Sequence, residues 1–356
     1  NENAFYIQST IDQRLQKISE KSLIDNLALF EKKYRNWNGS YKSLEDIMKY
    51  KNDHWNIAKV INKNSNNIEI SIINTEKIIN LNIDKNLYGP QKVSPNTYLN
   101  LNDYLFVTNI NDFFYAVQLH EINGSVIIMD PFNGDIVSMV GGVNYDISNF
   151  NRATQAYRQP GSAIKPFIFG AALEKGISAS TIVNDLPVNF DAESTGGVLW
   201  EPSNFNDVYL GPISIKEALT KSQNMVSIRL IKRINPSFAQ SYIRRFGFES
   251  SRIPPYFTLA LGAGAVTPLQ LAVGYGIIAN GGFYIEPYFI DRIVDSEGRL
   301  VRKYEPIRTG DEKLRVIDPR HAFIINNALS EVIKTGTGKK ARSLGRPDLA
   351  GKTGTT

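Results

Sequence analysis

Ser162 and Lys165 are the pair of side chains in this chain that could supply a nucleophile and its base. They lie three positions apart, just after Pro160-Gly161, and apolar residues then recur at helical spacing, so we expect a helix to begin here. On a helix, residues at this spacing share one face, which would put the amine beside the hydroxyl. Burial or a second cation would lower the pKa of that amine and let it accept the proton. On its own, the pair also fits a helix cap followed by a solvated lysine.

Ser222 and Asn224 form a second polar motif, far along the chain from this pair. They lie within residues 213–234, whose apolar spacing predicts one helix. A hydroxyl and an amide at these positions could relay a proton and hold a substrate amide. Capping of a helix start is the alternative role, and the motif alone favours it.

The third motif is Lys352-Thr353-Gly354, which follows Gly351. This context suits a strand that the backbone of a substrate can approach closely. The same three residue types recur at Lys334, but there they follow a helical pattern and predict ordinary helix termination. We therefore assign Lys352, and not Lys334, to the candidate site.

The composition of the chain excludes several kinds of site. With 356 residues, 42% of them hydrophobic, it is long enough for two domains with one sizeable core. It contains no Cys, and its 3 His are well separated, so we expect no disulfide, no metal site and no cofactor. The net charge of +5 is spread along the chain, which gives little support to nucleic-acid binding. No run approaches the roughly 18 apolar residues of a membrane helix.

The first third of the chain changes from a helical to a β-type pattern. Residues 5–10 read as a short strand, and Thr10 with Gln13 forms a capping-box pattern ahead of a long helix. Polar turns then separate five β-like runs, which predict a small inserted barrel or sandwich, with an irregular polar excursion as the alternative. These runs are residues 55–61, 68–73, 77–81, 104–107 and 113–119.

The remaining elements are predicted from turn and cap residues. Residues 125–129 and 136–140 flank a turn with Pro early and Gly late, which predicts a hairpin. The Pro-, Asn- and Gly-rich residues 178–212 read as a long surface excursion of the kind that lines a cleft. Further predictions are helices over 269–279, capped by Thr267-Pro268, and 319–334, and a hairpin from 283–294 and 300–304.

Taken together and in this order, the three motifs resemble those of the penicillin-recognising acyl-serine enzymes, the penicillin-binding proteins and serine β-lactamases. Three further segments, residues 129–134, 159–162 and 267–272, look like class A penicillin-binding proteins, and the resemblance covers nearly the whole chain. The β-rich insertion is similar in position to the OB-like domain of the Gram-negative 1A type.

This resemblance implies an α/β (α+β) fold, the penicillin-binding-protein and serine β-lactamase-like transpeptidase fold. An antiparallel sheet flanked by helices would carry a small all-β OB-like inserted domain. We expect a strand and helix of the transpeptidase region over 1–46, the insertion over 47–118 and the acyl-serine transpeptidase domain over 119–356. In the family, further strands and a helix follow the third motif, so we expect these to be missing here, together with an upstream glycosyltransferase domain and membrane anchor.

The resemblance also implies a role for each motif residue. Ser162 would form an acyl-enzyme, Lys165 would take its proton, Lys352 would depress the pKa of Lys165, and Ser222 would relay a proton to the leaving amine. Asn224 would hold a substrate amide, Thr353 would bind the substrate carboxylate, and the amides of Thr355 and Ser162 would form the oxyanion hole. The implied catalytic residues are Ser162, Lys165, Ser222 and Lys352, and the implied substrate-binding residues are Asn224, Thr353, Gly354 and Thr355.

The function implied is a periplasmic D,D-transpeptidase that cross-links peptidoglycan stem peptides ending in D-Ala-D-Ala and is trapped by β-lactam antibiotics. The expected partners are these peptides, β-lactams and a cell-wall synthesis or regulatory protein bound through the insertion, with no nucleic acid. A carboxypeptidase or β-lactamase would use water as the acceptor. A non-catalytic penicillin-binding sensor or a scaffolding module is the alternative from another class.

Overall fold

The computed structural model describes residues 4–34, 39–51, 55–65, 67–83, 95–110, 112–118, 122–145, 147–190, 200–307 and 309–355. The chain divides into two compact units. We call residues 1–11, 128–137 and 156–356 the large unit, and residues 12–127 and 138–155 the small unit. The candidate site residues named above all belong to the large unit.

The small unit contains a six-stranded antiparallel sheet. Side chains alternate across it: Ala58 and Val60 are buried in one apolar cluster, whereas Ile57 and Phe106 are buried in another. This alternation explains why the five predicted strands are all present, each within a few residues of its expected bounds. The strands, in sheet order, are β2 (Ser40–Tyr41), β6 (Tyr104–Ile110), β3 (Asn56–Lys63), β4 (Ile68–Ile72) and β5 (Ile78–Asn80), with β7 (Phe113–Val117) paired to β6. Its helices are α1 (Gln13–Tyr34), α2 (Leu44–Met48), α3 (Pro95–Tyr98) and α4 (Arg152–Gln155).

The start of α1 differs from the predicted capping box. Asp12, and not Thr10, caps the helix, because its carboxylate accepts a hydrogen bond from the Leu15 amide at 2.8 Å. The Thr10 hydroxyl instead donates to the Ile136 carbonyl at 2.7 Å. A contact with so distant a residue leaves no local trace in the sequence.

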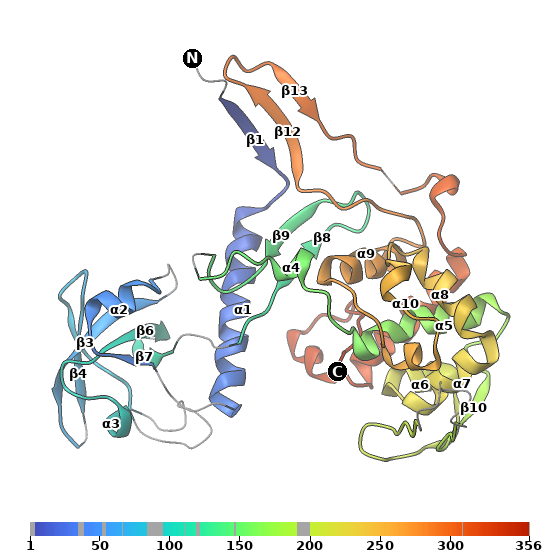
Figure 1. Cartoon of the computed structure of the whole chain (residues 1–356), viewed down its shortest axis with the longest axis horizontal. Coiled ribbons are helices and arrows are strands. Elements are labelled where there is room, and N and C mark those ends of the chain that lie inside the picture. Colours follow the sequence, from blue (N-terminus) through green and yellow to red (C-terminus); the bar gives the residue numbers. More distant parts are fainter. Residues whose placement is uncertain are drawn as a thin grey trace. The chain divides into compact units, whose positions relative to one another are not determined.

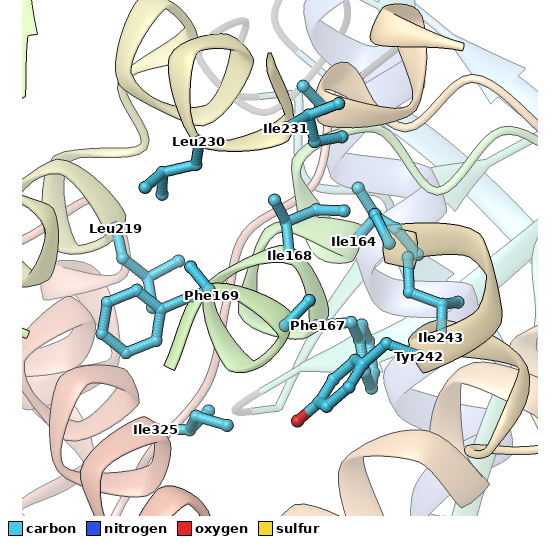
Figure 2. Packing of buried hydrophobic residues seen from close by; sticks show 14 of the residues in the cluster. Ile164, Phe167, Ile168, Phe169, Leu219, Leu230, Ile231, Tyr242, Ile243 and Ile325 are labelled. Atoms are coloured by element: carbon cyan, nitrogen blue, oxygen red, sulfur yellow. The ribbon is translucent and has the colours of Figure 1, made fainter. Parts of the chain in front are cut away.

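Helices form the core of the large unit, and α5 (Lys165–Glu174) lies at its centre. Every residue of α5 from Lys165 to Leu173 is buried, and Figure 2 shows side chains of other helices gathered around it. A helix that is apolar on all sides is normally enclosed by protein, as this one is. The surrounding helices are α6 (Ile215–Lys221), α7 (Asn224–Ile234), α8 (Pro236–Arg244), α9 (Pro268–Ala279) and α10 (Pro319–Lys334). The predicted helices over 269–279 and 319–334 are therefore confirmed, and Thr267 forms a capping box with Gln270.

Strands of the large unit join segments that are distant in the sequence. In Figure 1, β1 (Phe5–Ser9), in blue, lies beside β12 (Ile290–Asp295), in orange, and the two pair antiparallel. On its other side β12 pairs with β13 (Leu300–Lys303), which confirms the second hairpin. A separate antiparallel pair joins β10 (Ile182–Asp185) to β11 (Gly211–Ser214). The first hairpin is also present, as β8 (Val126–Met129) and β9 (Ile136–Val140).

Three predictions near the site are wrong in detail. Residues 213–234 are not one helix, because the chain leaves helical geometry at Ser222 and Gln223 between α6 and α7. The 178–212 stretch is not only a surface excursion, since it contains β10 and the buried Asp185 and Asn204. Of the described residues 345–355, none is in a strand, so Lys352 lies on an unpaired segment.

Candidate active site

Ser162 lies in a tight turn that leads directly into α5. The turn is a 3-10 helix, η2 (Gly161–Ile164), and Ser162 in it is half-buried. Gly161 has φ +52°, a left-handed conformation that glycine adopts without a steric penalty. Tyr275 on α9 donates its hydroxyl to the Ala163 carbonyl at 2.8 Å. Packing and hydrogen bonding therefore hold the serine at the first turn of the most buried helix.

Lys165 begins α5 and is only 2% exposed. Its Nζ donates to the Ser222 carbonyl at 2.6 Å and to Asn224 Oδ1 at 2.7 Å. Burial, assisted by the positive charge of Lys352 and opposed by Asp185, lowers the pKa of Lys165 from 10.5 to about 7. A neutral amine has two N–H donors and one lone pair. Because two acceptors already take both donors, the lone pair stays available to accept a proton.

The break between α6 and α7 puts Ser222 in contact with this amine. Ser222 caps the end of α6 with φ +61°, a left-handed conformation that is uncommon outside glycine. The bend leaves the Ser222 carbonyl outside the regular helix, where it can accept from Lys165. The Ser222 hydroxyl lies 3.4 Å from Lys165 Nζ. A continuous helix at this position would not present both atoms to the lysine.

Lys352 approaches the same hydroxyl from the other side. Its Nζ donates to Ser222 Oγ at 2.8 Å and to the Thr353 carbonyl at 2.9 Å. Burial lowers the pKa of Lys352 to about 8. The Ser222 hydroxyl therefore lies between two amines, each of which titrates near neutral pH.

The segment after Lys352 packs against the turn that holds Ser162. A Cβ added at Gly354 would lie 2.9 Å from the Pro160 carbonyl oxygen and 3.3 Å from the Ala163 Cβ. The Thr353 hydroxyl lies 2.6 Å from that of Thr337, which follows the end of α10. Lys334 is the last residue of α10, so the prediction that the earlier Lys-Thr-Gly ends a helix is confirmed.

The structure thus brings together most of the residues that the motifs predicted. Lys165, Ser222, Asn224 and Lys352 share hydrogen bonds, Ser162 lies one turn before Lys165, and Gly354 lies against the Ser162 turn. Thr355 is exposed near the end of the described chain. Three residues were missed by sequence reasoning: Thr337, Asp185 and Asn204. Asp185 and Asn204 lie within the Pro-, Asn- and Gly-rich residues 178–212, and this composition is their only signal in the sequence; Thr337 has none.

If Ser162 forms the acyl-enzyme that the resemblance implies, Gly354→Val is expected to lower the rate of acylation by about 100-fold, because misplacing a site by about 1 Å has effects of this size. The new side chain would push the 352–355 segment away from Pro160 and Ala163. Gly351→Ala is the matched control, since its added Cβ meets only the Ile333 side chain, at 3.8 Å. Acylation kinetics with a fluorescent penicillin measure the effect, and equal rates for the two variants would contradict the packing argument.

Metal-ligand clusters and membrane-spanning helices are both absent from the described residues. Among them, no group of three or more His, Asp or Glu side chains is placed to hold a metal ion. No helix in the described part of the chain is long and apolar enough to cross a membrane.

Comparison with known proteins identifies the family. Residues 124–356 match the family described as penicillin binding protein transpeptidase domain, and this match covers more than half of the chain. The chain therefore belongs to the penicillin-binding protein transpeptidase family, as the resemblance in the three motifs implied.

The most informative relatives are proteins named penicillin-binding protein 1A. The one from Neisseria flavescens is 46% identical over 250 residues, which are 70% of this chain and 31% of the relative. The one from Pseudomonas aeruginosa is 37% identical over 320 residues, 77% of this chain and 39% of the relative. The chain thus spans about a third of the length of these curated relatives.

Solved structures agree with the fold. The crystal structure of penicillin-binding protein 1A from Haemophilus influenzae has a TM-score of 0.86 and 28% identity, covering 99% of this chain and 59% of that chain. An imipenem acyl-enzyme of penicillin-binding protein A from M. tuberculosis is similar in fold, with a TM-score of 0.56 and 21% identity over 65% of this chain and 62% of that chain. The expected penicillin-binding-protein transpeptidase fold is confirmed.

Proposed function

We propose that this chain carries the D,D-transpeptidase activity of a peptidoglycan-synthesising enzyme, with Ser162 as the nucleophile. The observation that carries the proposal is the buried Lys165 amine. It lies one turn after Ser162, has a pKa lowered to about 7, and has its donors directed to the Ser222 carbonyl and Asn224 Oδ1. Such an amine can activate a serine hydroxyl near neutral pH without histidine.

The reaction divides into two acyl transfers. Lys165 accepts the proton of Ser162 while Oγ bonds to the carbonyl carbon of the penultimate D-Ala. The C–N bond to the terminal D-Ala then breaks, and its amine leaves with the proton that Lys165 gives up through the Ser222 hydroxyl, which leaves Lys165 neutral again. In the second transfer, an acceptor amine attacks the ester, forms the cross-link and returns a proton to Ser162 through Lys165. Splitting one amide exchange in this way lowers each barrier.

The remaining motif residues bind the peptide and the developing charge. We assign the second N–H of Asn224 Nδ2 and the exposed face of Gly354 to the substrate backbone, and the Thr353 hydroxyl to the substrate carboxylate. We assign the oxyanion hole to the amides of Ser162 and Thr355, and each such donor is worth about 3–4 kcal/mol of barrier. Lys352, held at Ser222, supplies the positive charge near the leaving amine.

Other properties of the whole protein follow from its relatives as part of this proposal. Class A enzymes of this type lie in the periplasm, are anchored to the inner membrane and carry a glycosyltransferase domain upstream. We propose the same for the complete protein, with β-lactams as inhibitors that acylate Ser162. The OB-like insertion over residues 47–118 is proposed to bind a cell-wall synthesis or regulatory protein.

A donor peptide ending in D-Ala-D-Ala, offered with and without an amine acceptor, tests the activity. We expect D-Ala release, with the acyl group found on the acceptor amine when one is present. Release into water alone would indicate a carboxypeptidase, and rapid penicillin turnover a β-lactamase. Acylation by penicillin without any acyl transfer would support the alternative of a non-catalytic penicillin-binding sensor. If the protein shows neither acylation nor transfer, the result would support a scaffolding module.

Acylation of Ser162 is expected to have a bell-shaped pH dependence with limbs near pH 7 and pH 8. The rate rises through the first limb because Lys165, with its pKa lowered to about 7, accepts a proton only when neutral. It falls through the second because Lys352, with its pKa lowered to about 8, loses its charge. Stopped-flow acylation by a fluorescent penicillin across this range measures both limbs. A rate independent of pH below neutrality would exclude Lys165 as the base.

A further inference from the structure

We propose that Asp185 and Asn204 are positioning residues for this reaction: Asp185 orients the Asn204 amide, and Asn204 fixes Asn224 where its oxygen holds the Lys165 amine. The inference rests on the proposed function, and it concerns two residues outside the three motifs. Neither contacts Lys165 through a hydrogen bond. They act through Asn224 and through charge.

Asp185 lies at the buried end of a series of hydrogen bonds that runs through Asn204 and Asn224 to Lys165. It is the last residue of β10 and has an exposed fraction of 0%. Its carboxylate accepts from Asn204 Nδ2 at 2.9 and 3.0 Å and from the Leu210 amide at 3.0 Å. Among the described residues, no Lys or Arg forms a salt bridge with it. A buried, hydrogen-bonded carboxylate of this kind is costly to keep for packing alone.

Asn204 supplies the cap that α7 lacks. The residue at the N-cap of α7, Gln223, makes no side-chain capping bond. Asn204, which is 3% exposed, accepts instead from the amides of Asn224 at 2.8 Å and Met225 at 3.2 Å. These are the first amides of α7, which have no partner within the helix. A residue from another part of the chain therefore determines where α7, and with it Asn224, begins.

Ser203, the residue before Asn204, fixes which way the side-chain amide of Asn224 points. Asn224 Nδ2 donates to the Ser203 carbonyl at 2.8 Å, so Oδ1 faces Lys165 Nζ. The reversed amide would direct its N–H groups at the amine. That arrangement would compete for the lone pair that must accept the proton from Ser162. Ser203 and Asn204 thus hold both the backbone and the side chain of Asn224.

Asp185 also acts on Lys165 through its charge. The charged groups that influence Lys165 are Lys352, which lowers its pKa, and Asp185, which raises it. Burial is the largest influence and acts in the same direction as Lys352. Asp185 therefore opposes both, and keeps Lys165 from becoming too weak a base.

Asp185→Asn tests the charge and Asn204→Ala tests the cap. In Asp185→Asn we expect the acid limb of acylation to move to lower pH by about half a unit or more, because a charge that raises the pKa of Lys165 is lost. In Asn204→Ala we expect acylation to fall about 10-fold or more, with the acid limb nearly unmoved, because Asn224 is released while Asp185 keeps its charge. Acylation is measured with a fluorescent penicillin over a pH range at which each variant is folded.

Asn280→Ala is the matched control for a merely structural effect. Asn280 is another buried asparagine of the large unit, with bonds to Pro131, Gly282 and Phe283 and none to the site. It should lower the melting temperature comparably to Asn204→Ala while leaving the acylation rate and its pH dependence as in the wild type.

A ¹⁵N NMR titration of the Lys165 amine gives a second readout that needs no reaction. It should show a lower pKa in Asp185→Asn than in the wild type. An unmoved acid limb and an unmoved Lys165 titration in Asp185→Asn, together with equal acylation rates for Asn204→Ala and Asn280→Ala, would overturn the positioning roles. Absence of acylation in the wild type would instead overturn the proposed function, and the NMR titration would still decide the role of Asp185. If Asp185→Asn does not fold, Asn204→Ala still tests the hydrogen bonds that join Asp185, Asn204 and Asn224.

Discussion

Ser162→Ala is expected to abolish covalent labelling of the protein by a fluorescent penicillin. The acyl-enzyme needs an oxygen nucleophile at this turn, and removing the nucleophile of a serine enzyme costs about 10⁶-fold in rate. No thiol can substitute, because the chain contains no Cys. Alanine fits the turn without strain, since residue 162 lies in the 3-10 helix η2, does not have a positive φ and is half-buried.

Ser227→Ala is the control for this variant. Ser227 is a buried serine on α7 whose hydroxyl donates to the Gln223 carbonyl at 2.9 Å. It should keep full labelling with a small loss of stability. Peptide mapping of the labelled wild type should find the adduct on Ser162. Undiminished labelling of Ser162→Ala, or an adduct on any other residue, would remove the proposed mechanism.

Lys165→Met is expected to have the second largest effect, a loss of about 10²- to 10⁴-fold in the acylation rate. This range is the usual contribution of a positioned general base. Met has a similar length and no charge, so it can occupy the buried space at the start of α5. The acid limb of the pH profile near pH 7 should disappear with the amine. A variant that keeps that limb would show that another group is the base.

The same substitution should change how stability depends on pH. The pKa of Lys165 is 10.5 as a free side chain and about 7 in the fold, so the unfolded chain binds more protons between these values. Wild-type stability therefore gains about 1.4 kcal/mol per pH unit from this group as pH rises across the interval, and the contribution is constant below it. Lys165→Met lacks this gain. Its loss of the contacts with Ser222 and Asn224 is independent of pH.

Urea unfolding below pH 7 and near pH 10 measures this difference. At each pH we take the unfolding free energy of Lys165→Met minus that of the wild type. This difference should be more favourable to the variant below pH 7 than near pH 10 by about 4 kcal/mol, which is most of the effect of the full pKa shift. Titrating groups that do not interact with Lys165 cancel because both proteins contain them. Parallel curves for the two proteins would mean that Lys165 is not held neutral by the fold.

The elements that were predicted correctly are those with a local cause. Successive side chains of β3 and β6 point to opposite faces of a sheet that is buried on both faces, so each strand contains a short run of consecutive apolar residues. The cap at Thr267 and the termination of α10 at Lys334 are also local. The order of the three polar motifs was enough to indicate the family, which the match over residues 124–356 confirms.

The predictions that failed depend on contacts between distant residues. Apolar spacing continues across Ser222, so the sequence offers no sign that α6 ends there and that α7 needs a new cap. That cap comes from Asn204, which lies 20 residues earlier. The capping-box pattern at Thr10 predicts a helix cap, but the Thr10 hydroxyl donates to the Ile136 carbonyl instead, and that bond spans 126 residues. The boundaries proposed for the OB-like insertion remain a prediction.

The sequence by itself determined which groups can react: a serine and a lysine at one helix start, no thiol, and two further polar motifs. It also determined most helices and strands, because their patterns repeat within a few residues. Only the tertiary structure shows that Lys165 can be neutral near pH 7, because its lowered pKa comes from burial by other helices and from the charge of Lys352. An amine with the same neighbours in sequence, but exposed to water, would stay protonated and leave Ser162 inert.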